Sequence, residues 1–441
     1  MASTASVCAV FSCQAVIIRC SLLKTVPSSQ NIPLVTVDLQ INNNTNPQAQ
    51  YLTWAPSPCR IRLTDPSGAS TPLVDVTLSG RSSATGGAIT FRKTATGTSG
   101  TTLSLQLPID GASVPFFVLG RFGQPSVSDG DVRIEVRDGT TVIHQVPVMV
   151  RIRKNANTLT PAERDRFLSA FAQLNDQGHG RFVDFRNMHT NAGSPQAHGA
   201  PGFLPWHRAY LLDLERELQA IDPSVTLPYW RFDQAAPNLF TRDFIGVSDE
   251  FGTVNFSANN PLQFWVTDGV PGISRRPFFN TGTGSANVIS EAQTLALGNR
   301  YASFQDLEGN PHGFAHTSFG GSISSIPTAA RDPLFFLLHA NVDRLWAKWQ
   351  RRFDRFDPTV AASFDSNPSN PIGHNLLDSM WPWNGVTGPP RPPTAPGGGL
   401  ASSPTVNAPG PQPRVQDCLD YQGRIEAAAQ LGFDYDDVQQ S

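Results

Sequence analysis

The sequence predicts a multidomain protein in which an all-β sandwich over residues 31–153 is followed by a mainly α-helical domain over residues 154–441. Three observations lead to this prediction. Apolar residues alternate with polar ones in the first region, the apolar period becomes that of a helix at Thr160, and a chain of 441 residues is long enough for two domains. Residues 1–30 follow neither pattern, so we expect them to be an N-terminal segment outside both domains.

The first region is expected to fold into about seven short strands, the number typical of a β-sandwich. Asp138-Gly139 is a strong signal for a two-residue hairpin turn. His144 is the single histidine of this region, and we interpret it as an ordinary strand side chain. Gly, Pro, Ser and Asp residues separate runs in which every second residue is apolar, such as Val35, Val37, Leu39 and Ile41, or Val146, Val148, Val150 and Ile152.

Four helices are expected in the second region. The first begins at Thr160, which acts as N-cap, with Pro161 at the first helical position and Glu163 completing a capping box. Residues 386–414 are rich in Pro and Gly, which is typical of a stiff surface loop. The other three helices are predicted over residues 204–221, from near His312, and from Asp332-Pro333 to Arg352.

Composition excludes several classes of function. A formal charge of −3 without a basic run argues against a nucleic-acid partner, and the chain has no apolar stretch of the roughly 20 residues that a membrane span needs. Residues 7–23 resemble a signal peptide only faintly, because no basic residue precedes them and Arg19 interrupts them. Five scattered cysteines do not make a disulfide framework, and their odd number slightly favours a cytoplasmic location over secretion. The oligomeric state is not predicted.

Six of the nine histidines fall into two groups of three. Neutral imidazole suits copper and zinc, and three imidazoles per ion leave a coordination position open for a substrate or O2. Two such groups side by side would form a dinuclear redox centre. The first group is His189, His198 and His207, with His179 as the alternative to His189, and the second is His312, His316 and His339.

The surroundings of the second group favour a redox centre over a zinc hydrolase. His312 and His316 are four residues apart, so on a helix they share one face. Gly313 follows His312 where a zinc protease would have Glu, and neither group contains a carboxylate at metal-ligand spacing that could bridge two zinc ions. Asp343 lies one turn after His339, where it can orient an imidazole or a neighbouring Arg, and Phe335 lies one turn before it, where its ring can pack on the imidazole.

Two segments resemble the copper motifs of the type 3 copper proteins, the family of tyrosinases, catechol oxidases, o-aminophenol oxidases and molluscan haemocyanins. The run Phe-Leu-Pro-Trp-His-Arg at 203–208, with His198 nine residues before His207, resembles the first motif. The second motif is similar to His312-x-x-x-His316 together with the runs that begin at Asp332 and Asn341. The resemblance covers about residues 155–440 and includes Leu-Pro-Tyr-Trp at 227–230 and Leu-Gly-Phe-Asp-Tyr at 431–435.

The resemblance implies a dinuclear copper enzyme built on a central four-helix bundle. Each histidine group would bind one of two copper ions, and O2 would be the co-substrate for the oxidation of o-diphenols or o-aminophenols to o-quinones or quinone imines. Glu308, four residues before His312, falls where the family's oxidases place a catalytic carboxylate that holds a water near the metals. The expected partner is therefore a small phenolic or aminophenolic substrate.

Three departures from the family pattern limit what the resemblance implies. Gln196 stands two residues before His198, where relatives with a Cys–His thioether carry Cys, so no thioether is expected there. Gly313 occupies the position at which many phenol-hydroxylating relatives carry Asn, so hydroxylation of monophenols stays open. The alternative is a haemocyanin-like O2 carrier whose dicopper site is occluded, for example by residues after 386. Whichever function holds, we expect the β-rich region to pack against the bundle as support, or as a cover or chaperone for the entrance to the metals.

Overall fold

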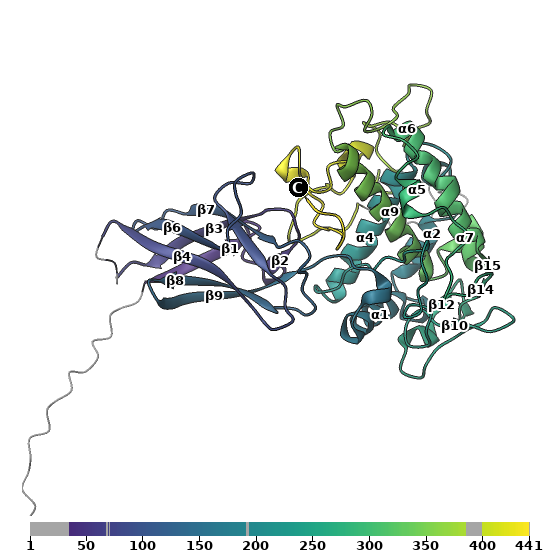
Figure 1. Ribbon diagram of the computed structural model, residues 1–441, viewed down its shortest axis with the longest axis horizontal. Coiled ribbons are helices and arrows are strands. Elements are labelled where there is room, and N and C mark those ends of the chain that lie inside the picture. The colour runs from purple at the N-terminus through teal and green to yellow at the C-terminus, as the bar shows by residue number, and fades with distance from the viewer. Residues whose placement is uncertain (1–34, 68, 70, 191–193, 385–398, 441) are drawn as a thin grey trace, which may run out of the picture.

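The computed structural model describes residues 35–440 except 68, 70, 191–193 and 385–398. The predicted segment 1–30, the signal-like residues 7–23 and residues 386–398 of the predicted loop 386–414 therefore lie outside the described residues. Figure 1 shows a sheet-rich N-terminal region and a helical region side by side, with the C-terminal stretch between them. The predicted order of an all-β and a mainly α region is observed.

The sheet-rich region contains two sheets whose buried faces share one apolar core, which includes Ile61, Leu78 and Phe116. Burial alternates along the strands, as the alternating sequence pattern predicts. The expected hairpin is present, since Gly139 adopts a φ of 54° between two antiparallel strands, β8 and β9. One sheet has the order β1 (Thr36–Ile41), β3 (Ser57–Asp65), β7 (Val114–Gly120), β5 (Ile89–Arg92), and the other β2 (Tyr51–Leu52), β9 (Thr141–Val150), β8 (Val132–Asp138), β4 (Leu73–Ser82), β6 (Thr102–Pro108).

The helical region is organised around two long, buried helices, α4 (Phe203–Ile221) and α9 (Leu334–Phe353), with α1 (Pro161–Asn175) and α2 (Phe182–Met188) beside them. Short elements complete it: α3 (Ser194–Ala197), α5 (Glu291–Thr294), α6 (Tyr301–Phe304), α7 (Phe314–Thr317) and α8 (Ile326–Ala329), with the strand pairs β10 (Val247–Ser248) and β11 (Val254–Asn255), β12 (Val266–Thr267) and β13 (Val270–Pro271), and β14 (Arg275–Pro277) and β15 (Phe319–Gly321). None of the described helices combines the length and the apolar character needed to cross a bilayer.

Local sequence signals located most of the helix ends correctly. The capping box of Thr160 and Glu163 is present at the start of α1, and α4 begins one residue before its predicted start. The helix predicted to begin near His312 is present and short: it consists of a π-helical turn (Gly309–Gly313) followed by the four residues of α7. Asn310 is extended, since a residue before proline avoids the helical conformation, and two glycines flank this turn.

A buried ionic network joins α4 to α9. Arg153 lies on the segment between the two regions, and its guanidinium donates to Glu215 of α4 at 2.7 Å and to Asp343 of α9 at 3.2 Å. Arg208 of α4 donates to the other oxygen of Asp343 at 2.6 Å, and the Tyr435 hydroxyl donates to Asp343 as well. All four ionic side chains are at most 2% exposed. These buried charges hold the two helices in one relative position. Removal of any one partner would leave an uncompensated buried charge, which is costly.

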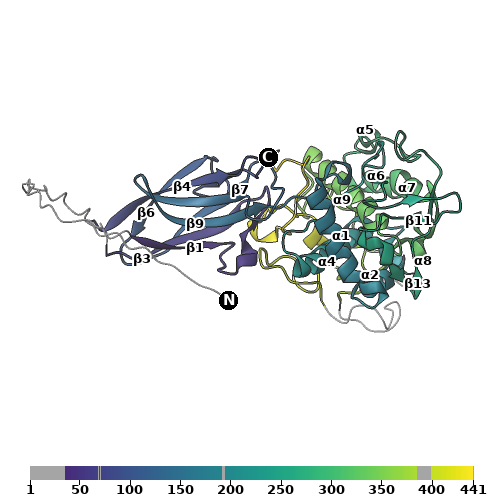
Figure 2. The ribbon, with the colours of Figure 1, turned by 90° about the horizontal axis from the view of Figure 1, so that it is seen from below.

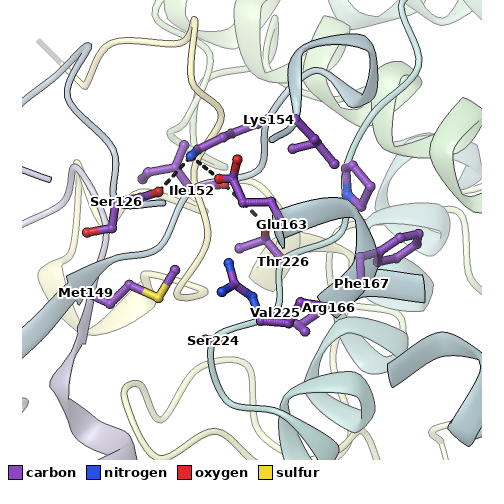
Figure 3. A pocket seen from close by; sticks show the side chains of 12 residues that line it. Ser126, Met149, Ile152, Lys154, Glu163, Arg166, Phe167, Ser224, Val225 and Thr226 are labelled. Atoms are coloured by element: carbon purple, nitrogen blue, oxygen red, sulfur yellow. Dashed lines mark hydrogen bonds and ion pairs between the residues drawn. The ribbon is translucent and has the colours of Figure 1, made fainter. Parts of the chain in front are cut away.

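The two regions meet through a polar junction. Figure 3 shows Lys154 pointing at Glu163 of α1, and its ammonium also donates to the Ser126 carbonyl at 2.7 Å. The space between these side chains is about 20 Å³, room for about one water molecule and too small for a ligand. On the other side of the junction, Trp54 donates from its backbone to Asp434 at 3.0 Å and from its indole to the Tyr435 carbonyl at 2.9 Å. These contacts support a fixed arrangement of the two regions.

Candidate metal centre

The six histidines come from five separate segments of the helical region. His189 directly follows α2, and His198, which is half-buried, directly follows α3. His207 lies in the second turn of α4 and His339 in the second turn of α9. His312 and His316 lie on the π-helical turn and on α7, with ring centroids 4.7 Å apart. The predicted sharing of one face by these two residues is observed.

Each predicted group forms a compact triad in space. One ligand atom from each of His189, His198 and His207 lies within 4.8 Å of the others, and the same holds for the other three histidines. The two triads are neighbours, because the rings of His207 and His339 stack with centroids 4.3 Å apart and an interplanar angle of 15°. Six imidazoles therefore face one common space, as a dinuclear centre requires.

Backbone carbonyls determine which nitrogen of the imidazole points into that space. The Nδ1 atom of His189 lies 3.1 Å from the Ile326 carbonyl, and that of His207 lies 2.9 Å from the Phe203 carbonyl. A carbonyl only accepts, so Nδ1 carries the hydrogen and Nε2 keeps its lone pair. The Nε2 atoms of these two side chains are buried and have no hydrogen-bond partner among the described residues. A buried acceptor without a partner is costly, and a metal ion would satisfy it.

The second triad shows the same arrangement. The Nδ1 atoms of His312 and His316 donate to the carbonyls of Glu308 at 2.8 Å and Ile323 at 2.7 Å. Their Nε2 atoms both approach Nε2 of His339, at 3.3 Å and 3.1 Å. Three ring nitrogens that converge at such distances, two of them with their hydrogen on the opposite side of the ring, fit one cation between them.

Electrostatics keep these imidazoles neutral, the form that binds metals. Burial lowers the pKa of His189, His207 and His339 well below the usual value, and the neighbouring histidines lower it further. Burial likewise lowers the pKa of His312, and that of His316 to about 4. Neither triad contains a carboxylate. A pair of zinc ions in a hydrolase would need bridging carboxylates, so the all-imidazole donor set fits copper better.

A cavity of about 460 Å³ leads from the surface to the triads. Its wall includes Glu308, whose side chain accepts from the Gly199 amide at 2.7 Å, next to His198. Burial raises the pKa of Glu308 to about 7. The Glu308 side chain is half-buried in the cavity wall. Most of the remaining wall is apolar and includes residues such as Ile323, Ile326 and Ala329.

Two phenylalanines pack on the triads from equivalent positions of the two long helices. Phe335 lies one turn before His339, with ring centroids 4.2 Å apart, and its ring also lies 4.6 Å from His189. Phe203 lies one turn before His207 at 4.7 Å, and 4.8 Å from His312. Each phenylalanine ring therefore packs on an imidazole of the first triad and on an imidazole of the second, and restricts the rotation of these imidazoles. The predicted packing of Phe335 is confirmed, whereas the sequence analysis did not single out Phe203.

The remaining candidates lie outside the triads. His179 is exposed after α1 and belongs to neither group, and His144 lies on β9. His374 is fully buried, and its Nδ1 accepts from the Gly202 amide at the start of α4. Gln196 accepts from the Trp381 amide at 2.8 Å. Asp343 orients arginines rather than an imidazole in its described contacts.

The metal cavity is lined by two segments of the helical region. The residues that line it come from 189–199 and 308–329. The β-rich region contacts α1 and the C-terminal stretch, and both views place it at the end of the molecule opposite α7 (Figures 1 and 2). Among the described residues, none of the β-rich region lines the metal cavity.

Comparison with known proteins agrees with this geometry. Residues 179–352, which include all six histidines, match the model of the common central domain of tyrosinase. A tyrosinase of Streptomyces glaucescens is 34% identical over 267 residues, which cover 53% of this chain and 92% of that protein. Grixazone synthase of Streptomyces griseus is 29% identical over 291 residues, 51% of this chain and 93% of that protein.

A solved tyrosinase from Burkholderia thailandensis aligns with a TM-score of 0.41 and 19% identity, over 65% of this chain and 74% of that one. The matches with these two sequence relatives extend over 92% and 93% of the relatives' own length. The chain belongs to the tyrosinase family of dinuclear copper oxidases, which use O2 to oxidise phenols.

Proposed function

We propose that His189, His198 and His207 hold one copper ion and that His312, His316 and His339 hold the other. The observation that carries this proposal is the convergence of the Nε2 atoms on one buried space, with Nδ1 bonded to a carbonyl in four of the six rings. When bound, the copper pair supplies the redox couple between the phenol and O2. The protein holds the imidazoles neutral, restricts their rotation and lines the approach with apolar side chains.

The reaction is the oxidation of o-diphenols, or of o-aminophenols, at this pair. Two o-diphenols release four electrons and four protons to one O2, which gives two o-quinones and two waters. In this proposal the phenol ring lies in the cavity against the triads, and the mostly apolar wall would keep bulk water away from the reacting oxygens.

A panel of substrates on copper-reconstituted protein tests this proposal. We expect quinone colour from an o-diphenol and a quinone imine from an o-aminophenol, with a monophenol converted more slowly because Gly313 offers no side chain that could assist its deprotonation. Rates are followed by absorbance with simultaneous O2 uptake, and copper is quantified by atomic absorption. Reversible O2 binding without product from any member of the panel would instead indicate a carrier.

Glu308 is the proposed catalytic carboxylate of the site. It lies on the cavity wall beside both triads. Its carboxylate accepts a hydrogen bond from the Gly199 amide, and its backbone carbonyl accepts one from Nδ1 of His312. From this position it can hold a water within reach of a substrate hydroxyl and accept the proton that the substrate loses.

We expect Glu308→Gln to lower kcat for an o-diphenol by about 10²-fold, the lower end of the effect of a positioned proton acceptor. Copper content should stay the same, because the imidazoles keep their carbonyl partners. The matched control is Glu250→Gln, at an exposed position outside the cavity. A kcat equal to that of the unsubstituted protein would show that Glu308 has only a structural role.

We further propose that residues 31–153 form a β-sandwich domain and residues 154–441 the dicopper domain, with α1, α2, α4 and α9 as the helices of its bundle. Two separate buried clusters support this division, since one contains only residues of the strand region up to Ile152 and the other begins at Ala156. The β-sandwich would stabilise the bundle through Arg153 and the junction with the C-terminal stretch.

A further inference from the structure

A second hollow adjoins the metal cavity. It measures about 580 Å³ and lies between the chain after β14, the segment around Val288, and the exposed side of α7. Its lining is mixed: Phe278, Phe279, Val288 and Phe314 form the apolar part, and Ser285, Asn287, Thr317 and Ser318 form the polar part. The function proposed above does not use this hollow.

The hollow and the metal cavity lie on either side of one turn of α7 and share one lining residue. Thr317 lines both of them, while Gly313 lines the metal cavity and the next residue, Phe314, lines the hollow. The Thr317 hydroxyl donates its hydrogen to the Gly313 carbonyl at 3.0 Å, so this hydrogen is used within the turn. A molecule with its ring at the triads can extend past Thr317 toward the hollow without meeting a charged side chain of the turn.

Aromatic rings are exposed at this place although they are held firmly. Phe278 is 66% exposed and Phe314 is 47% exposed. The Phe278 amide donates to the Ser318 carbonyl at 2.9 Å, and its ring lies so close to Gly320 that an added Cβ there would be 3.3 Å from Cζ of Phe278. Exposed apolar side chains clustered beside a reaction site are typical of a ligand-binding surface.

The charge around both hollows restricts the chemistry of the ligand. No Lys or Arg is among the residues that line either of them, and Glu308 is the one acidic side chain. A carboxylate bound here would lose its hydration without gaining a cationic partner, which is unfavourable. A neutral substituent meets no such penalty.

We propose that the substrates of this enzyme are neutral phenols with an apolar substituent, which lies in the hollow against Phe278 while the phenol ring lies at the triads. This inference rests on the proposed oxidase function and narrows its substrate class. Free amino acids and phenolic acids would be poor substrates, because their carboxylates would find no cationic partner among the lining residues.

Two esters of one o-diphenol test the inference. Methyl and butyl 3,4-dihydroxybenzoate have the same reacting ring and differ only in three methylenes. We expect kcat/KM to be about tenfold higher for the butyl ester, a modest value for methylenes that enter a partly open apolar site. Phe278→Ala should reduce that ratio to about twofold and Phe278→Leu to an intermediate value. The anionic free acid should be about tenfold poorer than the methyl ester.

Phe251→Ala is the matched control, because Phe251 is an 84% exposed phenylalanine that lines a different hollow. It should keep the tenfold preference. Equal kcat/KM for the two esters in the unsubstituted protein, an unchanged ratio in Phe278→Ala, or a preference for the free acid would each overturn the inference.

A binding measurement separates this inference from the oxidase function itself. Butyl and methyl 4-methoxybenzoate have no free hydroxyl to oxidise, so calorimetric titration of the full-length protein reports binding alone. We expect the butyl ester to bind about tenfold tighter, and Phe278→Ala to abolish the difference. If the protein shows this binding pattern but oxidises no substrate, the oxidase function is refuted and the hollow remains a binding site. If it oxidises the o-diphenols but binds both methoxybenzoates equally, the role of the hollow in binding the substituent is refuted.

Discussion

A His207→Ala variant is expected to lose one of the two copper ions and its oxidase activity. Truncation leaves His189 and His198 as the two imidazoles of that triad, too few for a stable tri-imidazole site. We expect kcat/KM for an o-diphenol to fall by more than about 10³-fold, beyond the 10–100-fold that loss of a group outside the ligand set typically costs. His339→Ala should remove the other ion with the same result.

Copper content and activity are measured together, so that loss of metal is distinguished from loss of fold. The matched control is His179→Ala, since His179 is exposed and outside both triads. It should retain both ions and full activity. If His207→Ala and His339→Ala each kept both copper ions, the proposed ligand assignment would be wrong.

The second large effect is expected from Arg153→Met. The substitution removes the cationic partner of Glu215 and of one oxygen of Asp343. Both carboxylates stay buried, because their side chains are only about 2% exposed. Breaking a buried ion pair from one side typically costs about 3–5 kcal/mol. We expect a loss of that size in the free energy of unfolding, measured with urea, where the transition is reversible.

Arg62→Met provides the matched comparison, because Arg62 pairs with Asp38 at 3.2 Å on the surface with half of its side chain exposed. An exposed pair contributes about 0–1 kcal/mol, so this variant should unfold much like the unsubstituted protein. Equal stability of the two variants would mean that water or a local rearrangement compensates the charges around Arg153.

The two predictions are connected through the helices that carry the ligands. His207 and Arg208 are adjacent on α4, and Asp343 lies one turn after His339 on α9. The ionic network that holds α4 against α9 therefore lies directly behind the stacked rings of His207 and His339. We expect Arg153→Met to lower copper affinity as well, because the ligands then belong to a less stable pair of helices.

Local patterns explain why much of this arrangement could be predicted. The alternation of Leu39 and Ile41 with polar residues, and the capping box of Thr160, depend only on neighbours within a few residues. The candidate metal ligands could be named because the spacing of His312 and His316 and the run around His207 are themselves short-range features. The helix predicted from near His312 is present, and its irregular π-helical start at Gly309–Gly313 also has a local cause, the extended Asn310 before Pro311.

Other features depend on contacts that no local pattern contains. Glu308 meets Gly199 across 109 residues, Arg153 meets Asp343 across 190, and His374 is buried against the start of α4 across 172. The hollow beside Phe278 combines three separate segments in the same way.

The sequence by itself determined the order of the two regions, the ends of the long helices and the identity of the candidate ligands, because propensity, capping and residue spacing act over a few residues. Tertiary structure alone decided that the triads share one cavity, that Arg153 secures the helices behind them and that an aromatic hollow adjoins the site. Those outcomes depend on how buried surfaces and charges from distant segments satisfy one another, which is settled only when the whole chain packs.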